Sequence, residues 1–169
     1  MGSIAQRRRG ARVCALVLSV VVTLLGACAE PTFPADADDT LRRVMAEKVL
    51  RVGVSENLPW TEVSDDGSVS GPEADILTAY AETLGASVDW TPGAESQLIR
   101  LLEQGDLDVV IGGLRSDSPW AAKAALTRPH AKTVGPDGKE EKLVFACRLG
   151  ENAMLSNVER FLIRQDLQP

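Results

Sequence analysis

The sequence has little histidine and little cysteine: its 169 residues include one histidine, His130, and three cysteines. A single imidazole supplies too few groups for a catalytic zinc site or for a Ser-His-Asp triad. No nucleophile stands beside a base, and no separated pair of acidic residues falls in a predicted pocket. We therefore expect no catalytic residue, no metal and no cofactor, and we expect that the chain is not an enzyme.

Long hydrophobic runs are also scarce, and the run near the N-terminus is short. Residues 13–25 form a stretch of 13 residues without charge, and it follows four arginines at positions 7, 8, 9 and 12. A run of that length is too short to cross a bilayer comfortably. After a positively charged segment, it is typical of the hydrophobic region of a secretory signal.

The hydrophobic run ends at residues 25–28 (Leu-Gly-Ala-Cys), which resemble the lipobox of bacterial lipoproteins. The resemblance implies a signal peptide over residues 1–27 and a lipid on Cys28, which becomes the first residue of the exported chain. The alternatives are an ordinary secretory signal cleaved nearby and an uncleaved anchor. Cys14 leaves with the leader and Cys28 carries lipid, so Cys147 has no partner and we expect no disulfide framework.

The exported chain has an excess of negative charge. The leader holds four of the 18 basic residues and none of the 24 acidic ones, so the remainder carries a net charge of −10 with His130 neutral. This charge argues against nucleic acid as a partner and against a polybasic membrane contact. The lipid on Cys28 is then the link to the membrane, and we expect a membrane-anchored lipoprotein in the periplasm or at the cell surface.

The chain after the leader predicts one α/β domain, because about 140 residues suffice for a single core. Residues 28–47 are expected to be a lipid-anchored tether, rich in proline and acid at its start, with a short helix at its end. Residues 48–169 are expected to form one lobe. Within it, strand and helix signals alternate, which is typical of βαβ units on a largely parallel sheet. The first expected elements are strands at 49–54, 86–90 and 109–111 and helices at 72–84 and 95–104.

Two glycines follow the strand predicted at 109–111. Gly112 and Gly113 allow backbone amides to approach another group closely. They lie at the carboxyl end of a strand, where open α/β sheets usually bind ligands. The same pair of glycines also fits a simple turn, so the neighbouring motifs decide its interpretation.

Six short motifs occur in an order and at spacings that resemble the family 3 extracellular solute-binding proteins. They lie at residues 50–54, 59–60, 71–76, 84–85, 105–114 and 127–130. The resemblance implies a periplasmic receptor for polar amino acids in an ABC transporter system, with the type II periplasmic-binding-protein fold. In one motif Pro72 replaces the usual aromatic residue, and the acids Glu73 and Asp75 also suit the positive end of a helix dipole.

Members of that family have two lobes that close on the ligand, but this chain has room for one. Only residues 132–142 occupy the place of the second lobe, and they predict a polar hairpin. The strand and helix expected at 143–148 and 152–165 resemble the elements that return to the first lobe. We therefore expect a three-layer single lobe, with a mostly parallel sheet and flanking helices. His130 is expected to replace an aromatic residue at the family's hinge.

The resemblance also suggests ligand-binding residues around Gly113. Trp60 matches an aromatic residue that stacks on the ligand in the family. Ser118 keeps a turn in which the family carries an arginine for the ligand carboxylate. That arginine is missing here, so Arg115 or Arg128 is the expected replacement. Alternatively, both arginines are solvated surface residues and Trp60 covers the end of the sheet.

Two functions remain open. The first is a lipid-anchored solute-binding protein outside the cytoplasm, which acts in association with a transporter. It would bind a small polar or amino-acid-like solute near Trp60, Gly113, Arg115 and Ser118. One open face buries less of a ligand than a closed cleft, so its affinity would be modest. The alternative is an interaction lipoprotein that keeps the fold, no longer binds a small ligand and docks another envelope protein.

Overall fold

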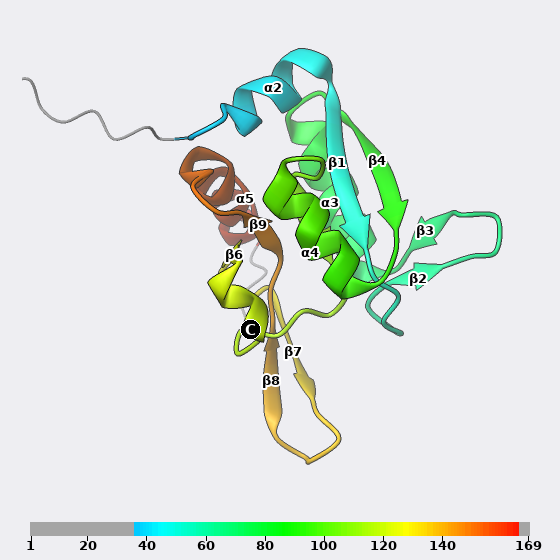
Figure 1. Ribbon diagram of the computed structural model, residues 1–169. Helices are drawn as coiled ribbons and strands as arrows, with labels where there is room; N and C mark the ends of the chain where they lie inside the picture. The colour runs from blue at the N-terminus through cyan, green and yellow to red at the C-terminus, as the bar shows by residue number, and fades with distance from the viewer. Residues whose placement is uncertain (1–35, 166–169) are drawn as a thin grey trace, which may run out of the picture. The chain divides into compact units, whose positions relative to one another are not determined.

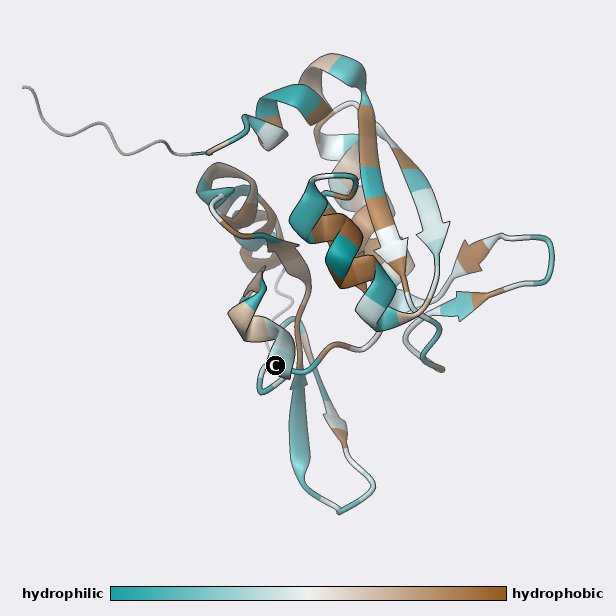
Figure 2. Ribbon diagram, in the orientation of Figure 1, coloured by the Kyte–Doolittle hydropathy of each residue, from teal (hydrophilic) through white to brown (hydrophobic). Residues whose placement is uncertain are grey.

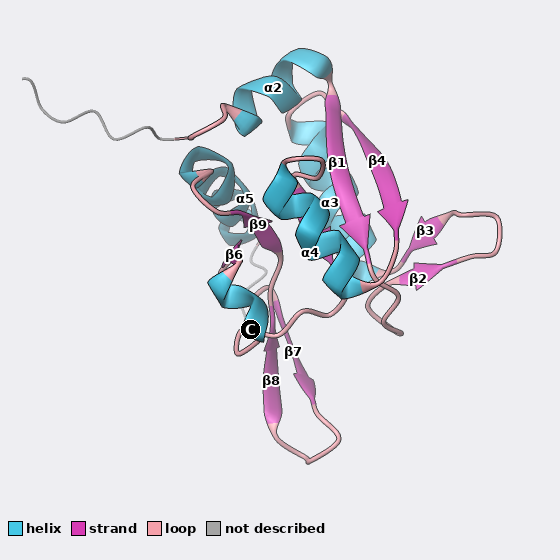
Figure 3. Cartoon of the chain, in the orientation of Figure 1, coloured by secondary structure: helices cyan, strands magenta, loops and turns pink. Residues whose placement is uncertain are grey.

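The computed structural model describes residues 36–165, so the predicted leader and Cys28 lie outside the described residues. The described part contains a five-stranded sheet with helices on both faces (Figures 1 and 3). The order of strands across the sheet is β4 (Ser87–Pro92), β1 (Val49–Val54), β5 (Val109–Ile111), β9 (Ala146–Arg148) and β6 (Ala124–Leu126).

Four of the five strands run in the same direction. β1 pairs in parallel with both β4 and β5. β9 is antiparallel to both of its neighbours, β5 and β6, so β6 runs in the direction of β5. The expectation of a mostly parallel sheet is confirmed.

Two apolar clusters fill the space between the sheet and its helices. One face is covered by α2 (Thr40–Glu47), α3 (Pro72–Thr83) and α5 (Asn152–Arg164), and the other by α4 (Glu95–Gln104). In β5, Val109 and Ile111 pack into the first cluster and Val110 into the second. Successive side chains of a strand point to opposite faces, which explains why an uninterrupted apolar run lies in the middle layer. The predicted three-layer lobe is confirmed.

Helix α2 belongs to the same folded body, although the sequence predicts it as the end of the tether. Val44 of α2 is fully buried in the first cluster. The start of the helix is held by Glu151, whose carboxylate accepts hydrogen bonds from the amides of Asp38 (2.8 Å) and Thr40 (3.1 Å). The apolar side of α2 thus packs against the lobe, so the folded part begins before residue 48.

A buried carboxylate joins α2 to the sheet. Asp108, which is 1% exposed, accepts hydrogen bonds from the amide of Arg51 (2.9 Å) and from its guanidinium (2.9 Å). Arg43 of α2 binds the same carboxylate. Because a buried charge needs close partners, the two arginines explain how this acid is tolerated in the interior.

Two hairpins lie outside the sheet: β2 (Glu62–Val63) with β3 (Val69–Ser70), and β7 (Ala131–Val134) with β8 (Glu140–Leu143). The second is the hairpin that the sequence predicts at 132–142. It projects beyond the end of the sheet toward which β1 points, and β8 is largely hydrophilic (Figures 1 and 2). Among the residues from 36 to 165, no helix has the length and apolarity that crossing a bilayer requires.

The single strand expected at 143–148 is divided in the structure. Leu143 ends β8 and Ala146 begins β9, with Val144 and Phe145 between them. Val144 packs into the second cluster and Phe145 into the first, so this apolar segment crosses from the hairpin into the sheet.

Candidate ligand-binding site

Two clefts open beside Gly113, just after the carboxyl end of β5. The first, which we call the polar cleft, has a volume of about 350 Å³. Since ligands of open α/β sheets bind at this end of the strands, the polar cleft is the principal candidate site. Its polar and glycine lining residues are Asn57, Glu95, Gly113, Arg115, Ser118 and Glu141.

Arg115 is the cation of the polar cleft, and it is already paired. Its guanidinium donates to Oε1 of Glu141 at 2.6 Å and lies 3.4 Å from Asp117. The hydrogen bond to Glu141, with the charges of Glu141 and Asp117, raises the pKa of Arg115. The side chain remains 48% exposed. A guanidinium has five N–H donors, so Arg115 retains donors for a ligand.

Two carboxylates, Glu95 and Glu141, share the polar cleft with this one guanidinium. Glu95 begins α4 and accepts a hydrogen bond from the indole Nε1 of Trp120. Ser118 precedes the 3₁₀ helix Pro119–Ala122, and its hydroxyl accepts a hydrogen bond from the Trp120 amide at 3.3 Å. The cleft therefore offers a positively charged donor, Arg115, and two negatively charged acceptors, Glu95 and Glu141. A zwitterion requires this combination.

The amides of Gly112 and Gly113 are bound by a carboxylate of the chain itself. Oε2 of Glu73 accepts hydrogen bonds from the amides of Gly112 (2.9 Å) and Gly113 (3.0 Å). Glu73 is completely buried, whereas Asp75 is exposed. An interaction with the helix dipole therefore does not fully explain Glu73. Its carboxylate binds the two glycine amides that, from the sequence, are expected to face a ligand.

Both positions favour glycine, Gly112 because the Ser55 backbone lies close to it and Gly113 because of its left-handed backbone conformation and the nearby Asn57 side chain. Gly112 has a φ of +142° and Gly113 a φ of +67°. A Cβ atom at Gly112 would lie 2.6 Å from the carbonyl oxygen of Ser55, and one at Gly113 would lie 2.1 Å from Nδ2 of Asn57. The side chain of Asn57 in turn donates to the carbonyl oxygen of Gly112 at 3.0 Å. Because these two residues have no side chain, the loop after β1 can pack closely against the end of β5.

His130 joins Glu73 to the base of the β7–β8 hairpin. Its Nε2 lies 3.1 Å from Oε1 of Glu73, and its backbone amide donates to the carbonyl oxygen of Leu143 at 3.0 Å. Its ring stacks on Phe145 with a centroid distance of 4.1 Å. The ring packs as an aromatic residue would, and it also provides a polar contact to a buried carboxylate.

The second cleft, which we call the hairpin cleft, has a volume of about 310 Å³. It lies between residues 57–60, after β1, and the β7–β8 hairpin, which contributes residues 133–136, Glu141 and Leu143. Asn57, Gly113 and Glu141 line both clefts, so the two clefts adjoin.

The structure places four of the five predicted ligand-binding residues at these two clefts. Gly113 lines both of them, Arg115 and Ser118 line the polar cleft, and Trp60 lines the hairpin cleft. Arg128 is among the lining residues of neither cleft, and its backbone amide donates to a glutamate of α5 at 2.8 Å.

Three polar residues that line the polar cleft, Asn57, Glu95 and Glu141, are not expected from the sequence. Asn57 and Glu95 shortly follow β1 and β4, so their positions after predicted parallel strands could have identified them. Glu141 lies on the hairpin. Its place at the clefts depends on how the hairpin docks, and no local pattern predicts that.

Comparison with known proteins identifies the family. The family model of the bacterial extracellular solute-binding proteins, family 3, matches residues 50–164. The chain belongs to this family, as its six motifs indicate. No curated protein matches the sequence.

Solved structures share the fold at low sequence identity. The arginine-bound form of domain 1 from TmArgBP, the ArgBP of T. maritima, is 23% identical, with a TM-score of 0.64 over 72% of this chain and 97% of that one. The ancestral amino-acid-binding protein AncCDT-1, a precursor of cyclohexadienyl dehydratase, is 18% identical, with a TM-score of 0.67 over 75% and 93%. An arginine-specific periplasmic binding protein of Salmonella typhimurium is 13% identical, with a TM-score of 0.62 over 72% and 94%.

Proposed function

We propose that the chain is a one-lobed binding protein for a small zwitterionic, amino-acid-like solute. The observation that carries the proposal is the lining of the polar cleft, where Arg115 stands with Glu95 and Glu141. The ligand carboxylate accepts hydrogen bonds from Arg115, for which a guanidinium has a suitable geometry. The ligand ammonium donates to the carboxylate of Glu95, since that of Glu141 is already paired with Arg115.

A single lobe is enough for such binding in a protein of the same fold. Domain 1 of TmArgBP has been solved in an arginine-bound form, and it matches 72% of this chain. In this chain the β7–β8 hairpin occupies the place of a second lobe. We propose a binding role and not catalysis, in keeping with a solute-binding family, although AncCDT-1 is described as the precursor of an enzyme.

The cellular setting that we propose follows from the leader. A lipid on Cys28 would anchor the protein to a membrane in the periplasm or at the cell surface, where it would deliver its solute to a transporter. Mass spectrometry of the purified protein tests the anchor, since cleavage before Cys28 with added acyl chains gives a defined mass. An unmodified Cys28 would exclude the lipid.

Isothermal titration calorimetry of the full-length protein in detergent, with a panel of amino acids and organic acids at millimolar concentration, tests the binding function. We expect saturable heat for at least one zwitterion and a loss of affinity of roughly tenfold or more in Arg115→Ala, because a charge-assisted contact is removed. Arg128→Ala, which changes an arginine outside both clefts, is the matched control and should bind as the wild type does. Absence of heat for every compound would contradict the proposal.

Loss of affinity in Arg115→Ala is interpretable because the same substitution should leave the folded state intact. The Arg115–Glu141 pair is solvent-exposed on the arginine side, and exposed ion pairs contribute little to stability. We expect the urea unfolding midpoint of Arg115→Ala to match that of the wild type.

A second candidate function, an interaction lipoprotein without a small ligand, is favoured by one observation. The chain's own carboxylates already bind the groups that a ligand would use: Glu73 binds the amides of Gly112 and Gly113, and Glu141 binds Arg115. Photo-crosslinking from position 60 in native membranes separates the two functions. Capture of one envelope protein, together with absence of heat in the titrations, would support this candidate.

A further inference from the structure

We propose that the hairpin cleft is a subsite that selects an apolar or aromatic side chain on the bound solute. This inference rests on the proposed function, in which the charged groups of the solute lie in the adjoining polar cleft. The two clefts share Asn57, Gly113 and Glu141, so a ligand of amino-acid size reaches from one into the other.

The two clefts differ in charge although they adjoin. Three charged residues, Glu95, Arg115 and Glu141, line the polar cleft. Glu141 is the one charged residue among those that line the hairpin cleft, and its carboxylate is bound to Arg115 at 2.6 Å. A charged side chain entering the hairpin cleft would lose water without gaining a counter-ion that is not already paired, which is unfavourable.

Both walls of the hairpin cleft carry exposed apolar side chains. Leu58 on one wall is 66% exposed and Val134 on the other is 71% exposed. They are the two most exposed large hydrophobic residues in the described part of the chain, and they line the same cleft. The half-buried ring of Trp60 adds an aromatic surface there. Apolar residues that gather at one place on a surface mark binding sites, whereas single ones do not.

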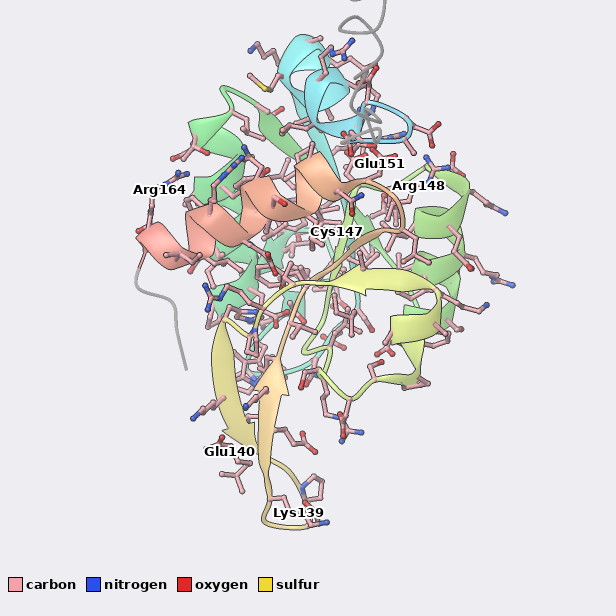
Figure 4. All side chains as sticks on the ribbon, turned by 90° about the vertical axis from the view of Figure 1, so that its left-hand side faces the viewer. Lys139, Glu140, Cys147, Arg148, Glu151 and Arg164 are labelled. Atoms are coloured by element: carbon pink, nitrogen blue, oxygen red, sulfur yellow. The ribbon has the colours of Figure 1, made fainter. Side chains whose placement is uncertain are left out.

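The wall formed by the hairpin is fixed at its base. The amide of Ser116 donates to the carbonyl oxygen of Lys142 at 2.9 Å, and the amide of His130 donates to that of Leu143 at 3.0 Å. Lys139 and Glu140 lie at the far end, away from the body (Figure 4). The hairpin thus gives the single lobe an opposing wall, and enclosing a ligand between two walls buries more of its surface.

An apolar subsite in the hairpin cleft predicts a definite order of affinities among amino acids. L-Phenylalanine and L-leucine should bind more tightly than glycine, which carries the same charged groups without a side chain. L-Arginine should gain less than they do, because its guanidinium would lie in the hairpin cleft without an unpaired counter-ion. This order differs from the arginine binding described for the solved neighbours.

Titration calorimetry with these four amino acids, on the full-length wild type and three variants, tests the subsite. We expect wild-type affinities for phenylalanine and leucine to exceed that for glycine by roughly tenfold. Val134→Ser should lower the affinities for phenylalanine and leucine by about three- to tenfold and leave the affinity for glycine unchanged. Val134→Ile should bind all four amino acids as the wild type does. Leu149→Ser is the matched control, since Leu149 is also exposed (51%) but lies outside both clefts.

The outcomes distinguish the subsite from the proposed function. If wild-type protein binds glycine as tightly as phenylalanine, or if Val134→Ser lowers all affinities equally, the subsite is wrong and the binding function stands. If wild-type protein binds none of the four amino acids, the subsite is wrong together with the function on which it rests.

Discussion

Oε1 of Glu73 and Nε2 of His130 lie 3.1 Å apart, and both side chains are almost completely buried. The second oxygen of Glu73 accepts hydrogen bonds from the amides of Gly112 and Gly113. One carboxylate therefore connects the first turn of α3, the end of β5 and the segment that leads into the β7–β8 hairpin. Glu73 also contacts the other wall of the hairpin cleft, since its backbone amide donates to the carbonyl oxygen of Trp60 at 3.2 Å.

Removal of the Glu73 carboxylate should destabilise the fold strongly. Glu73→Ala leaves the amides of Gly112 and Gly113 without their acceptor and the buried Nε2 of His130 without its partner, and we expect the free energy of unfolding to fall by about 2–4 kcal/mol. Urea denaturation followed by circular dichroism measures the change.

Asp75→Ala is the matched control for Glu73→Ala. Asp75 is an exposed acid in the same turn of α3, and its loss should cost less than about 1 kcal/mol through the helix dipole alone. Equal losses in the two variants would mean that Glu73 also acts only through the dipole.

The carboxylate of Asp108 should be equally sensitive to substitution. Asp108→Asn keeps the size of the side chain but removes the charge that pairs with Arg43 and Arg51. Breaking a buried ion pair from one side is costly, and we expect a loss of about 2–4 kcal/mol. The neighbouring Asp106 is exposed, so Asp106→Asn should unfold at the wild-type urea concentration.

The anchoring of α2 should depend on pH through Asp36 and Glu151. Burial and the carboxylate of Glu151 raise the pKa of Asp36 to about 6. Burial opposes the charge on Glu151, but its hydrogen bonds to Asp36, Asp38 and Thr40 outweigh this effect and lower its pKa. The folded state therefore favours a protonated Asp36 beside an ionised Glu151.

The raised pKa of Asp36 has a defined consequence for stability. Its contribution is complete below the unfolded-state pKa of 3.8 and is lost as the pH rises through about 6. The contribution of Glu151 has the opposite sign and is lost at acidic pH, as the pH falls through its lowered pKa. Between about pH 5 and pH 7 the Asp36 effect should reduce the free energy of unfolding, by about 1 kcal/mol once solvent screening of this partly exposed group is allowed for.

Urea titrations at several pH values test this dependence. Asp36→Asn cannot ionise, so its stability should be flatter than that of the wild type between about pH 5 and pH 7. Asp65→Asn, which changes an exposed acid in the β2–β3 hairpin loop, is the control and should follow the wild-type curve. A wild-type curve as flat as that of Asp36→Asn would contradict a raised pKa of Asp36 in the folded state.

The fold up to β5 could be predicted because its signals are local. The apolar residues at 49–54 and 109–111 mark buried strands, and the structure places β1 and β5 there. After Leu114 the prediction is less accurate. Val144 and Phe145 are apolar because they enter opposite clusters while crossing into the sheet, and hydropathy does not distinguish such a crossing from a strand.

The site could be predicted only in part, for a similar reason. Arg115 and Ser118 follow the strand that ends at the clefts, so their sequence positions indicate their location. The role of Glu73 depends on two amides that lie far away in sequence, and its place in a helical first turn offered a sufficient local explanation. Glu141 reaches the clefts through the docking of the hairpin, which no spacing of residues specifies.

The position of β9 determines the order in which the sheet can be completed during synthesis. β4, β1 and β5 can pair with one another as soon as residue 111 has emerged, but β5 still lacks its second neighbour, β9, and β6 pairs with β9 alone. β6 therefore waits, without a neighbour, until the chain beyond the hairpin has been made. Until then β5 presents an unpaired edge, which is the kind of surface on which unfinished chains associate with one another. Completion of the sheet therefore depends on β9, which enters between β5 and β6 and is synthesised after both.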